Sequence, residues 1–327
     1  MRILACLLAL AAALPASPVS ASVQPNIVAA GVITDPLYGQ TAGPTYSGVA
    51  KLLLTTTNGT FLCTGSVVGA TSILTAGHCV TDSAGAAITT MVTAILSDGL
   101  GNTLTISTPN YVVHPTWSGS ATGLGTTTDL TVVNFASVFP NWVSIYALYN
   151  TNDELGKVFN VAGFGQVGSN HGASVPGSAG TFHQGQNQFE RLNNQMGVGW
   201  TNDNLVMDFD NGTAGNDAFG FFYGLAGLGL GNFEVNTAPG DSGGPSFIAG
   251  KVAGVTSFGT VLTGGGGATS DCLAGVNSSC GEFSSMVRVS SNVAWIQGAM
   301  VPEPATWLLA SFALAALGWR HHKRHVS

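Results

Sequence analysis

The stretch Gly240-Asp241-Ser242-Gly243-Gly244-Pro245 is the most informative part of this 327-residue sequence. The two glycines that follow the serine leave the backbone open around its hydroxyl, and the glycine two residues before it can present its N–H to the same space. A serine hydroxyl alone is a poor nucleophile and needs an adjacent base. The stretch therefore predicts a nucleophile at Ser242, with a histidine and a carboxylate elsewhere in the chain.

Two earlier segments supply these partners, so that the order along the chain is His, Asp, Ser. His78 lies in Leu74–Cys79, at the end of an apolar strand, and Asp129 opens the apolar run that follows it. A neutral imidazole accepts a proton near pH 7, and a buried carboxylate fixes its tautomer. We therefore predict a triad of His78, Asp129 and Ser242. Two other upstream acids open no apolar strand: Asp82 and Asp98.

Short runs of β-branched and apolar residues, separated by Gly, Pro, Asn and Asp, recur along the chain and are typical of an all-β barrel or sandwich. Helical periodicity occurs only near Asn292–Met300, and Gly-rich stretches such as Gly168–Gly185 are expected to be surface loops. The expected strands are Gly48–Thr55, Ser66–Leu74, Thr89–Leu96, Asn110–His114, Leu130–Phe135, Lys157–Ala162, Ser246–Ile248, Val252–Ser257 and Ser285–Val289.

Both ends of the chain have the composition of processing segments. Residues 1–21 carry Arg2, an apolar run from Ile3 to Leu14 and the small residues Val19-Ser20-Ala21, which predict an export signal peptide cleaved after Ala21. The run is shorter than the ~20 residues that a spanning helix needs. The domain itself is then expected over residues 22–300.

The C-terminal segment, residues 301–327, has three parts in order. Val301–Pro304 contains Pro-Glu-Pro, Ala305–Trp319 is apolar, and Arg320–His325 is basic. Together they resemble the PEP-CTERM sorting signal of Gram-negative bacteria. That resemblance implies a short transmembrane segment, transient anchoring in the inner membrane, and cleavage by an exosortase during delivery to the cell envelope, the surface or the medium. A permanent tail anchor is the alternative.

The charge balance of residues 22–300 excludes one class of partner. This segment contains five Lys and Arg residues and fifteen Asp and Glu residues, which gives it a net charge of −10. Nucleic acids need a positive surface, so none is expected as a partner. We expect a monomer without cofactor or metal.

The segment Asp208–Asp217 gathers oxygen ligands that would suit Ca²⁺. It lacks the spacing of a known calcium loop, however, and is interpreted as a solvated acidic turn.

The three motifs resemble the chymotrypsin-type (trypsin-like, S1) serine peptidases over residues ~45–298. Supporting segments occur in the family's order: Cys63-Thr64-Gly65-Ser66, Gly163-Phe164-Gly165 (the family's Gly-Trp-Gly), Ser257-Phe258-Gly259 (its Ser-Trp-Gly) and Val293-Ala294-Trp295-Ile296 in its terminal helix. The resemblance implies two six-stranded Greek-key β-barrels packed together with a C-terminal helix. It also implies a secreted serine endopeptidase that hydrolyses polypeptides through an acyl-enzyme.

The resemblance assigns roles to particular residues. Ser242 attacks the scissile carbonyl, His78 takes its proton, Asp129 orients His78, and the backbone N–H groups of Gly240 and Ser242 form the oxyanion hole. Asp241 pairs in the family with an N-terminal amine that proteolysis liberates. Two segments resemble such mature starts, and the sequence does not choose between them: Ile27-Val28-Ala29-Ala30-Gly31 and Val32-Ile33.

The four cysteines beyond the signal segment are expected to form disulfides because the chain is exported, although four cysteines allow three pairings. The resemblance suggests Cys63–Cys79 and Cys272–Cys280. Ala238 stands where the family commonly has a cysteine that pairs with the wall of the specificity pocket. The rigidity of that pocket is therefore in question.

The specificity pocket departs further from trypsin. The resemblance places Asn236 at the pocket floor, and a neutral floor lacks the carboxylate that selects Arg or Lys. Ser257-Phe258-Gly259 would form a wall that pairs with the substrate strand. Ser284 lies near the opposite wall, where the register leaves open that Glu282 reaches the pocket and restores a basic preference. We expect a neutral or polar side chain in this pocket.

Two other functions remain open. The chain could be a catalytically silent surface protein that keeps the trypsin fold and only binds, but the triad positions and the glycines around Ser242 are all present. It could also be an acyl esterase, since the same nucleophile opens esters. Its serine does not lie in the Gly-x-Ser-x-Gly elbow of α/β-hydrolases.

Overall fold

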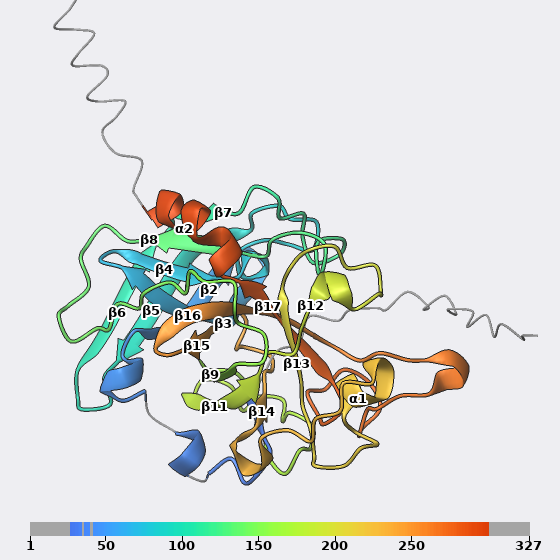
Figure 1. Cartoon of the computed structure of the whole chain (residues 1–327). Helices are drawn as coiled ribbons and strands as arrows, with labels where there is room; N and C mark the ends of the chain where they lie inside the picture. Colours follow the sequence, from blue (N-terminus) through green and yellow to red (C-terminus); the bar gives the residue numbers. More distant parts are fainter. Residues whose placement is uncertain (1–26, 35, 40–41, 301–327) are drawn as a thin grey trace, which may run out of the picture.

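The structure, a computed structural model, describes residues 27–34, 36–39 and 42–300, and most of its strands lie in two curled antiparallel sheets (Figure 1). The first sheet has the strand order β6-β5-β2-β3-β4-β8-β7. Its strands are β2 (Val49–Thr56), β3 (Gly59–Gly69), β4 (Ser72–Thr75), β5 (Thr89–Ser97), β6 (Thr103–Thr108), β7 (Tyr111–Val113) and β8 (Thr131–Asn134).

The second sheet has the order β11-β9-β15-β16-β17-β13-β12, and a small third sheet has the order β10-β1-β14. The second sheet contains β9 (Val158–Gly163), β11 (His183–Gln188), β12 (Arg191–Leu192), β13 (Leu205–Asp208), β15 (Pro245–Ile248), β16 (Lys251–Thr260) and β17 (Phe283–Arg288). The third contains β1 (Ile27–Ala29), β10 (Val167–Gly168) and β14 (Val235–Asn236).

The two main sheets have seven strands each, where six were expected, because one strand in each is bent into two pieces. β6 and β7 lie at opposite ends of the first sheet and are joined by Pro109 and Asn110, where the proline cannot donate to a ladder. β11 and β12 are joined likewise by Phe189 and Glu190. Phe189 N–H donates to Lys157 and Glu190 N–H to Val206, so the bend closes the second barrel. The all-β, two-barrel fold is therefore confirmed.

Apolar residues fill each barrel and the junction between them. In β2 the buried residues alternate with outward ones, so that Leu52 and Leu54 enter the first core. Phe159 and Phe189 stack at 3.9 Å between ring centroids in the second core. Side chains from both sheets and from helix α2 (Val293–Met300) meet between the barrels, and Ile296 is fully buried there. The C-terminal helix is thus confirmed.

Several sequence expectations were wrong in detail. Ser66–Leu74 is not one strand, because a turn at residues 70–71 separates β3 from β4. The expected loop Gly168–Gly185 contains the start of β11, whose sequence His-Gln-Gly-Gln-Asn-Gln is almost entirely polar. β11 pairs with β9 along its whole length, and Gly185 packs so closely against Val235 that an added Cβ would lie 2.2 Å from a valine methyl.

The predicted signal peptide (residues 1–21) and the apolar segment of the sorting signal (residues 305–319) lie outside the described residues. Among the residues that the structure describes, no helix has the length and apolar character needed to cross a membrane.

Candidate active site

His78 is held in place by Asp129 through two hydrogen bonds. His78 follows β4 in a short 3-10 turn, and Asp129 precedes β8, which pairs with β4. The His78 backbone N–H donates to Asp129 Oδ1 at 2.8 Å, and His78 Nδ1 lies 2.7 Å from Asp129 Oδ2. Ser257 Oγ donates to the same Oδ2 at 2.6 Å. Asp129 is 1% exposed, so these bonds fix both the carboxylate and the ring.

Ser242 lies in a tight turn that precedes β15, where two glycines adopt left-handed backbone angles. Gly240 has φ of 107° and Gly243 has φ of 79°. A Cβ at Gly243 would lie 2.0 Å from Thr75 Oγ1, so the turn requires glycine there for both conformation and space. Thr64 binds the turn to the first barrel, because its N–H donates to the Ser242 carbonyl and its Oγ1 to the Gly240 carbonyl, both at 2.8 Å.

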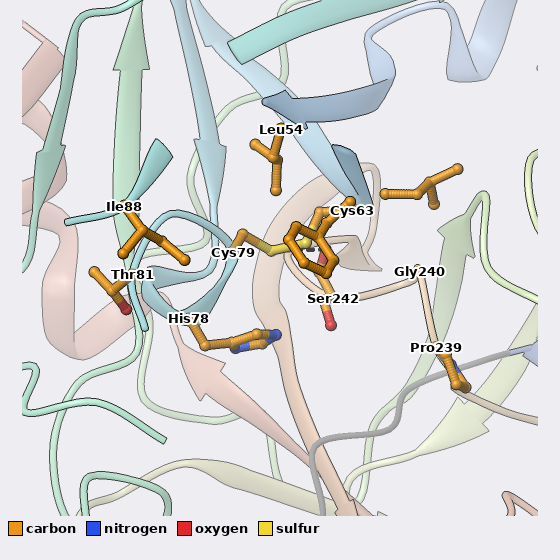
Figure 2. A pocket seen from close by; sticks show the side chains of 11 residues that line it. Leu54, Cys63, His78, Cys79, Thr81, Ile88, Pro239, Gly240 and Ser242 are labelled. Carbon is orange, nitrogen blue, oxygen red and sulfur yellow. Dashed lines mark hydrogen bonds between the residues drawn. A yellow bond between two sulfur atoms is a disulfide. The ribbon is translucent and has the colours of Figure 1, made fainter. Parts of the chain in front are cut away.

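The structure brings His78 and Ser242 to one side of a cavity of about 270 Å³ between the barrels. Figure 2 shows the imidazole and the serine hydroxyl projecting into the same space, with the Cys63–Cys79 bridge beside them. His78 Nε2 is buried and has no hydrogen-bond partner among the described residues. The nitrogen that a general base would use is therefore available.

Both suggested disulfides are confirmed. Cys63 pairs with Cys79, which ties β3 to the turn that carries His78, and Cys272 pairs with Cys280. Because Cys63 and Cys79 are joined to each other, their proximity to His78 does not make a metal site.

Asn236 is 1% exposed and lies beside Ser284. Ser284 Oγ donates to Asn236 Oδ1 at 2.7 Å, while Asn236 Nδ2 donates to the Ser278 carbonyl at 3.2 Å. Glu282 instead accepts at Oε1 from the Asn277 N–H at 2.8 Å. Burial raises the pKa of Glu282 to about 8, although backbone N–H groups oppose this shift. The Glu282 carboxylate is therefore hydrogen-bonded to the backbone of its own loop.

The segment Ser257-Phe258-Gly259 lies in β16, which pairs on one side with β17. No other strand of the described residues pairs with this segment, so its second edge has no ladder partner. The Phe258 side chain is fully buried, in a cluster with Trp117, Leu124 and Trp200. Its ring meets Trp200 edge to face at 5.3 Å between centroids.

Two supporting roles were missed from the sequence. Thr64 was noted only as part of a motif, and Ser257 only as a pocket wall. The hydrogen bonds of these two residues cross between the barrels, with a sequence separation of 176 for Thr64 and Gly240 and of 128 for Ser257 and Asp129. No local sequence pattern indicates hydrogen bonds between residues so far apart in the chain.

The acidic segment Asp208–Asp217 is not the solvated turn that was expected. Asp208, Asp210 and Asp217 are 2%, 4% and 2% exposed. Residues 212–215 do form an exposed turn, but the three carboxylates point inward, where each lies against backbone N–H groups or another carboxylate. Helix α1 (Ala218–Tyr223) begins directly after Asp217.

Comparisons with known proteins agree with this geometry. The family profile described as Trypsin matches residues 38–216, and the PEP-CTERM protein-sorting motif matches residues 301–324. The first match includes His78 and Asp129 and ends before the Ser242 turn. The sorting motif indicates export and delivery to the cell surface. No curated protein matches the chain.

Many solved structures share the fold, and two of them are given as examples. HL collagenase, at 1.7 Å resolution, is 18% identical with a TM-score of 0.54, over 80% of this chain and 96% of that one. Neuropsin, a serine protease expressed in the limbic system of mouse brain, is 16% identical with a TM-score of 0.52, over 78% of this chain and 95% of that one.

Proposed function

The chain belongs to the trypsin family and is a serine endopeptidase, and from that premise we propose that it cleaves polypeptides outside the cytosol through an acyl-enzyme on Ser242. The observation that carries the proposal is the buried contact of His78 Nδ1 with Asp129 Oδ2 at 2.7 Å. His78 Nε2, beside Ser242, has no hydrogen-bond partner in the described part of the chain. A serine peptidase needs this arrangement of base and orienting carboxylate.

The reaction proceeds in two halves. Ser242 Oγ bonds to the scissile carbonyl carbon as its proton passes to His78 Nε2, and Asp129 stabilises the resulting imidazolium. The same nitrogen then protonates the leaving amine as the C–N bond breaks. Water, deprotonated by His78, opens the acyl-enzyme and restores Ser242.

The oxyanion of each tetrahedral intermediate binds at the Ser242 turn. Neither the Gly240 N–H nor the Ser242 N–H donates to any acceptor within residues 42–300. Two free backbone donors beside the nucleophile suit the developing negative charge.

The substrate lies as an extended strand along the free edge of Ser257-Phe258-Gly259. Its primary side chain faces Asn236, whose amide is held by Ser278 and Ser284. Glu282 is hydrogen-bonded within its own loop, and the floor residue Asn236 is neutral, so a neutral side chain is preferred to Arg or Lys.

The mature chain begins at Ile27 in this proposal. β1 (Ile27–Ala29) pairs with β14, so that Val28 is opposite Asn236, and Val28 is fully buried. Val32, the other candidate start, is 54% exposed. A chain that began at Val32 would lack β1 and leave β14 unpaired on that side. The domain then spans residues 27–300, with the signal segment before it and the sorting segment after it.

A peptide-library digest with the mature protein tests this function. We expect internal cleavage after neutral side chains, with little after Arg or Lys, and no cleavage by Ser242→Ala. Hydrolysis of ester substrates without any peptide cleavage would instead identify an acyl esterase. Binding of peptides without turnover of either would identify a silent binding protein.

A further inference from the structure

Five acidic side chains gather where β13 ends and β14 begins. Asp208 closes β13, and Glu234 directly precedes β14. Four of the five are at most 4% exposed, and the fifth is mostly buried beside them. This acidic cluster consists of Glu190, Asp208, Asp210, Asp217 and Glu234.

No basic side chain of the described residues forms an ion pair with the acidic cluster. The ion pairs of the described residues involve other acids, namely Asp129, Asp153, Glu154 and Asp203. Arg191, next to Glu190 in sequence, donates to the Gln195 carbonyl and stacks on the Tyr223 ring at 4.5 Å. Buried carboxylates without a counter-charge are unfavourable unless they share protons or bind a cation.

Three of the five carboxylates accept hydrogen bonds from backbone N–H groups. Asp208 Oδ2 accepts from Phe219 at 2.9 Å, Asp217 Oδ1 from Gly220 at 2.5 Å, and Glu234 Oε1 from the Asp210 N–H at 2.8 Å. Asp210 Oδ1 is buried and has no hydrogen-bond partner among the described residues. Buried polar atoms are normally satisfied, so this orphan oxygen marks a place where a ligand belongs.

The orphan carboxylate faces the others at a suitable distance. One oxygen each from Asp208, Asp210 and Asp217 lies within 4.8 Å of the other two. Oxygens on opposite sides of a Ca²⁺ ion are ~4.6–5.2 Å apart, because each Ca–O distance is ~2.3–2.6 Å.

We propose that the acidic cluster binds one Ca²⁺ ion, with Asp208, Asp210 and Asp217 as ligands and Glu234 as a supporting acid. Only carboxylates are present, which suits a hard cation and not Zn²⁺ or Cu²⁺. Mg²⁺ needs shorter, near-octahedral contacts and keeps its waters, which a buried site does not provide. Because Glu234 precedes β14, the ion fixes residues 209–234 and with them Asn236.

Calcium binding is measured with the mature Ser242→Ala protein, so that the result does not depend on peptidase activity. After dialysis against EGTA, isothermal titration calorimetry is expected to show one Ca²⁺ site. Ca²⁺ at about 5 mM, above the 10⁻⁴–10⁻³ M range of weak extracellular calcium modules, is expected to raise the Tm by about 5 °C. Mg²⁺ at the same concentration is expected to raise the Tm by a smaller amount. Ca²⁺ is also expected to slow amide hydrogen exchange in residues 209–234.

Asp210→Asn in the same background should abolish the calcium-dependent rise in Tm while raising the Tm in EGTA, since it removes an uncompensated buried charge. Asp153→Asn, in an exposed pair with Lys157, is the matched control and should respond to Ca²⁺ as the parent does. Absence of calcium binding to the parent protein would overturn the site even if Asp210→Asn fails to fold. An equal response to Mg²⁺, or an unchanged response in Asp210→Asn, would overturn the assignment.

Discussion

Replacing Asp129 by asparagine is expected to lower kcat/KM by about 10⁴-fold, the usual cost when the orienting carboxylate of a Ser-His-Asp triad is lost. The amide keeps one oxygen to accept the His78 backbone N–H, so the turn remains folded. It cannot accept at both positions, because its NH₂ donates where Oδ2 accepted from His78 Nδ1 and Ser257. The imidazole then adopts the tautomer with its proton on Nε2 and no longer serves as a base.

The matched control for Asp129→Asn is Asp82→Asn. The Asp82 carboxylate caps a neighbouring turn through Ala84 and Ala86, bonds that the asparagine oxygen can also accept. Peptide turnover of this variant should equal that of the parent, and both variants should keep the parent's circular dichroism. Unchanged turnover in a folded Asp129→Asn protein would reject the role of Asp129.

The largest expected effect on stability comes from Glu154. Its carboxylate is fully buried and accepts from Arg288 Nε at 3.0 Å and Nη2 at 2.6 Å. Glu154→Ala leaves Arg288 with only a 3.5 Å contact to Asp203. Removing one partner of a buried ion pair typically costs about 3–5 kcal/mol, and we expect the free energy of unfolding to fall by that amount. Urea denaturation of the Ser242→Ala protein at pH 7 measures it.

The same ion pair makes stability depend on pH. Burial alone would raise the pKa of Glu154, but hydrogen bonds from Arg288 and Ser290 outweigh it and hold the pKa below its ordinary value. A lowered pKa contributes stability above the ordinary value of 4.5, and that contribution is lost as pH falls through the folded value. The parent should therefore lose more stability than Glu154→Ala on acidification below pH ~4.5. The Asp153→Ala variant, which loses an exposed ion pair, should show nearly the same dependence of stability on pH as the parent. Unaltered urea midpoints in Glu154→Ala would contradict this reasoning.

The sequence predicted the features that depend on local pattern. The Ser242 turn was predictable because two of its glycines have positive φ and close contacts, which leave a signature in neighbouring residues. The strands with alternating or continuous apolar residues, such as β2 and β16, were also found. β11 was missed because its stability comes from the ladder with β9 and from the contact of Gly185 with Val235, and not from its own hydrophobicity.

Features that combine distant segments were beyond the sequence. The burial of Asp210 depends on Glu234 accepting its N–H, 24 residues away. The local sequence around these acids therefore predicted a solvated turn. The enclosure of Phe258 likewise depends on Trp117 and Trp200, which come from different barrels and carry no shared motif.

The proposal that Ser242 is a nucleophile activated by His78 is tested most directly by labelling with a fluorophosphonate probe, followed by mass spectrometry of the tryptic peptides. The mature protein beginning at Ile27 is expected to gain one adduct, located on Ser242. Ser242→Ala should gain none, and Asp129→Asn should react far more slowly. Absence of labelling in the folded, correctly processed parent, or an adduct that persists in Ser242→Ala, would contradict it.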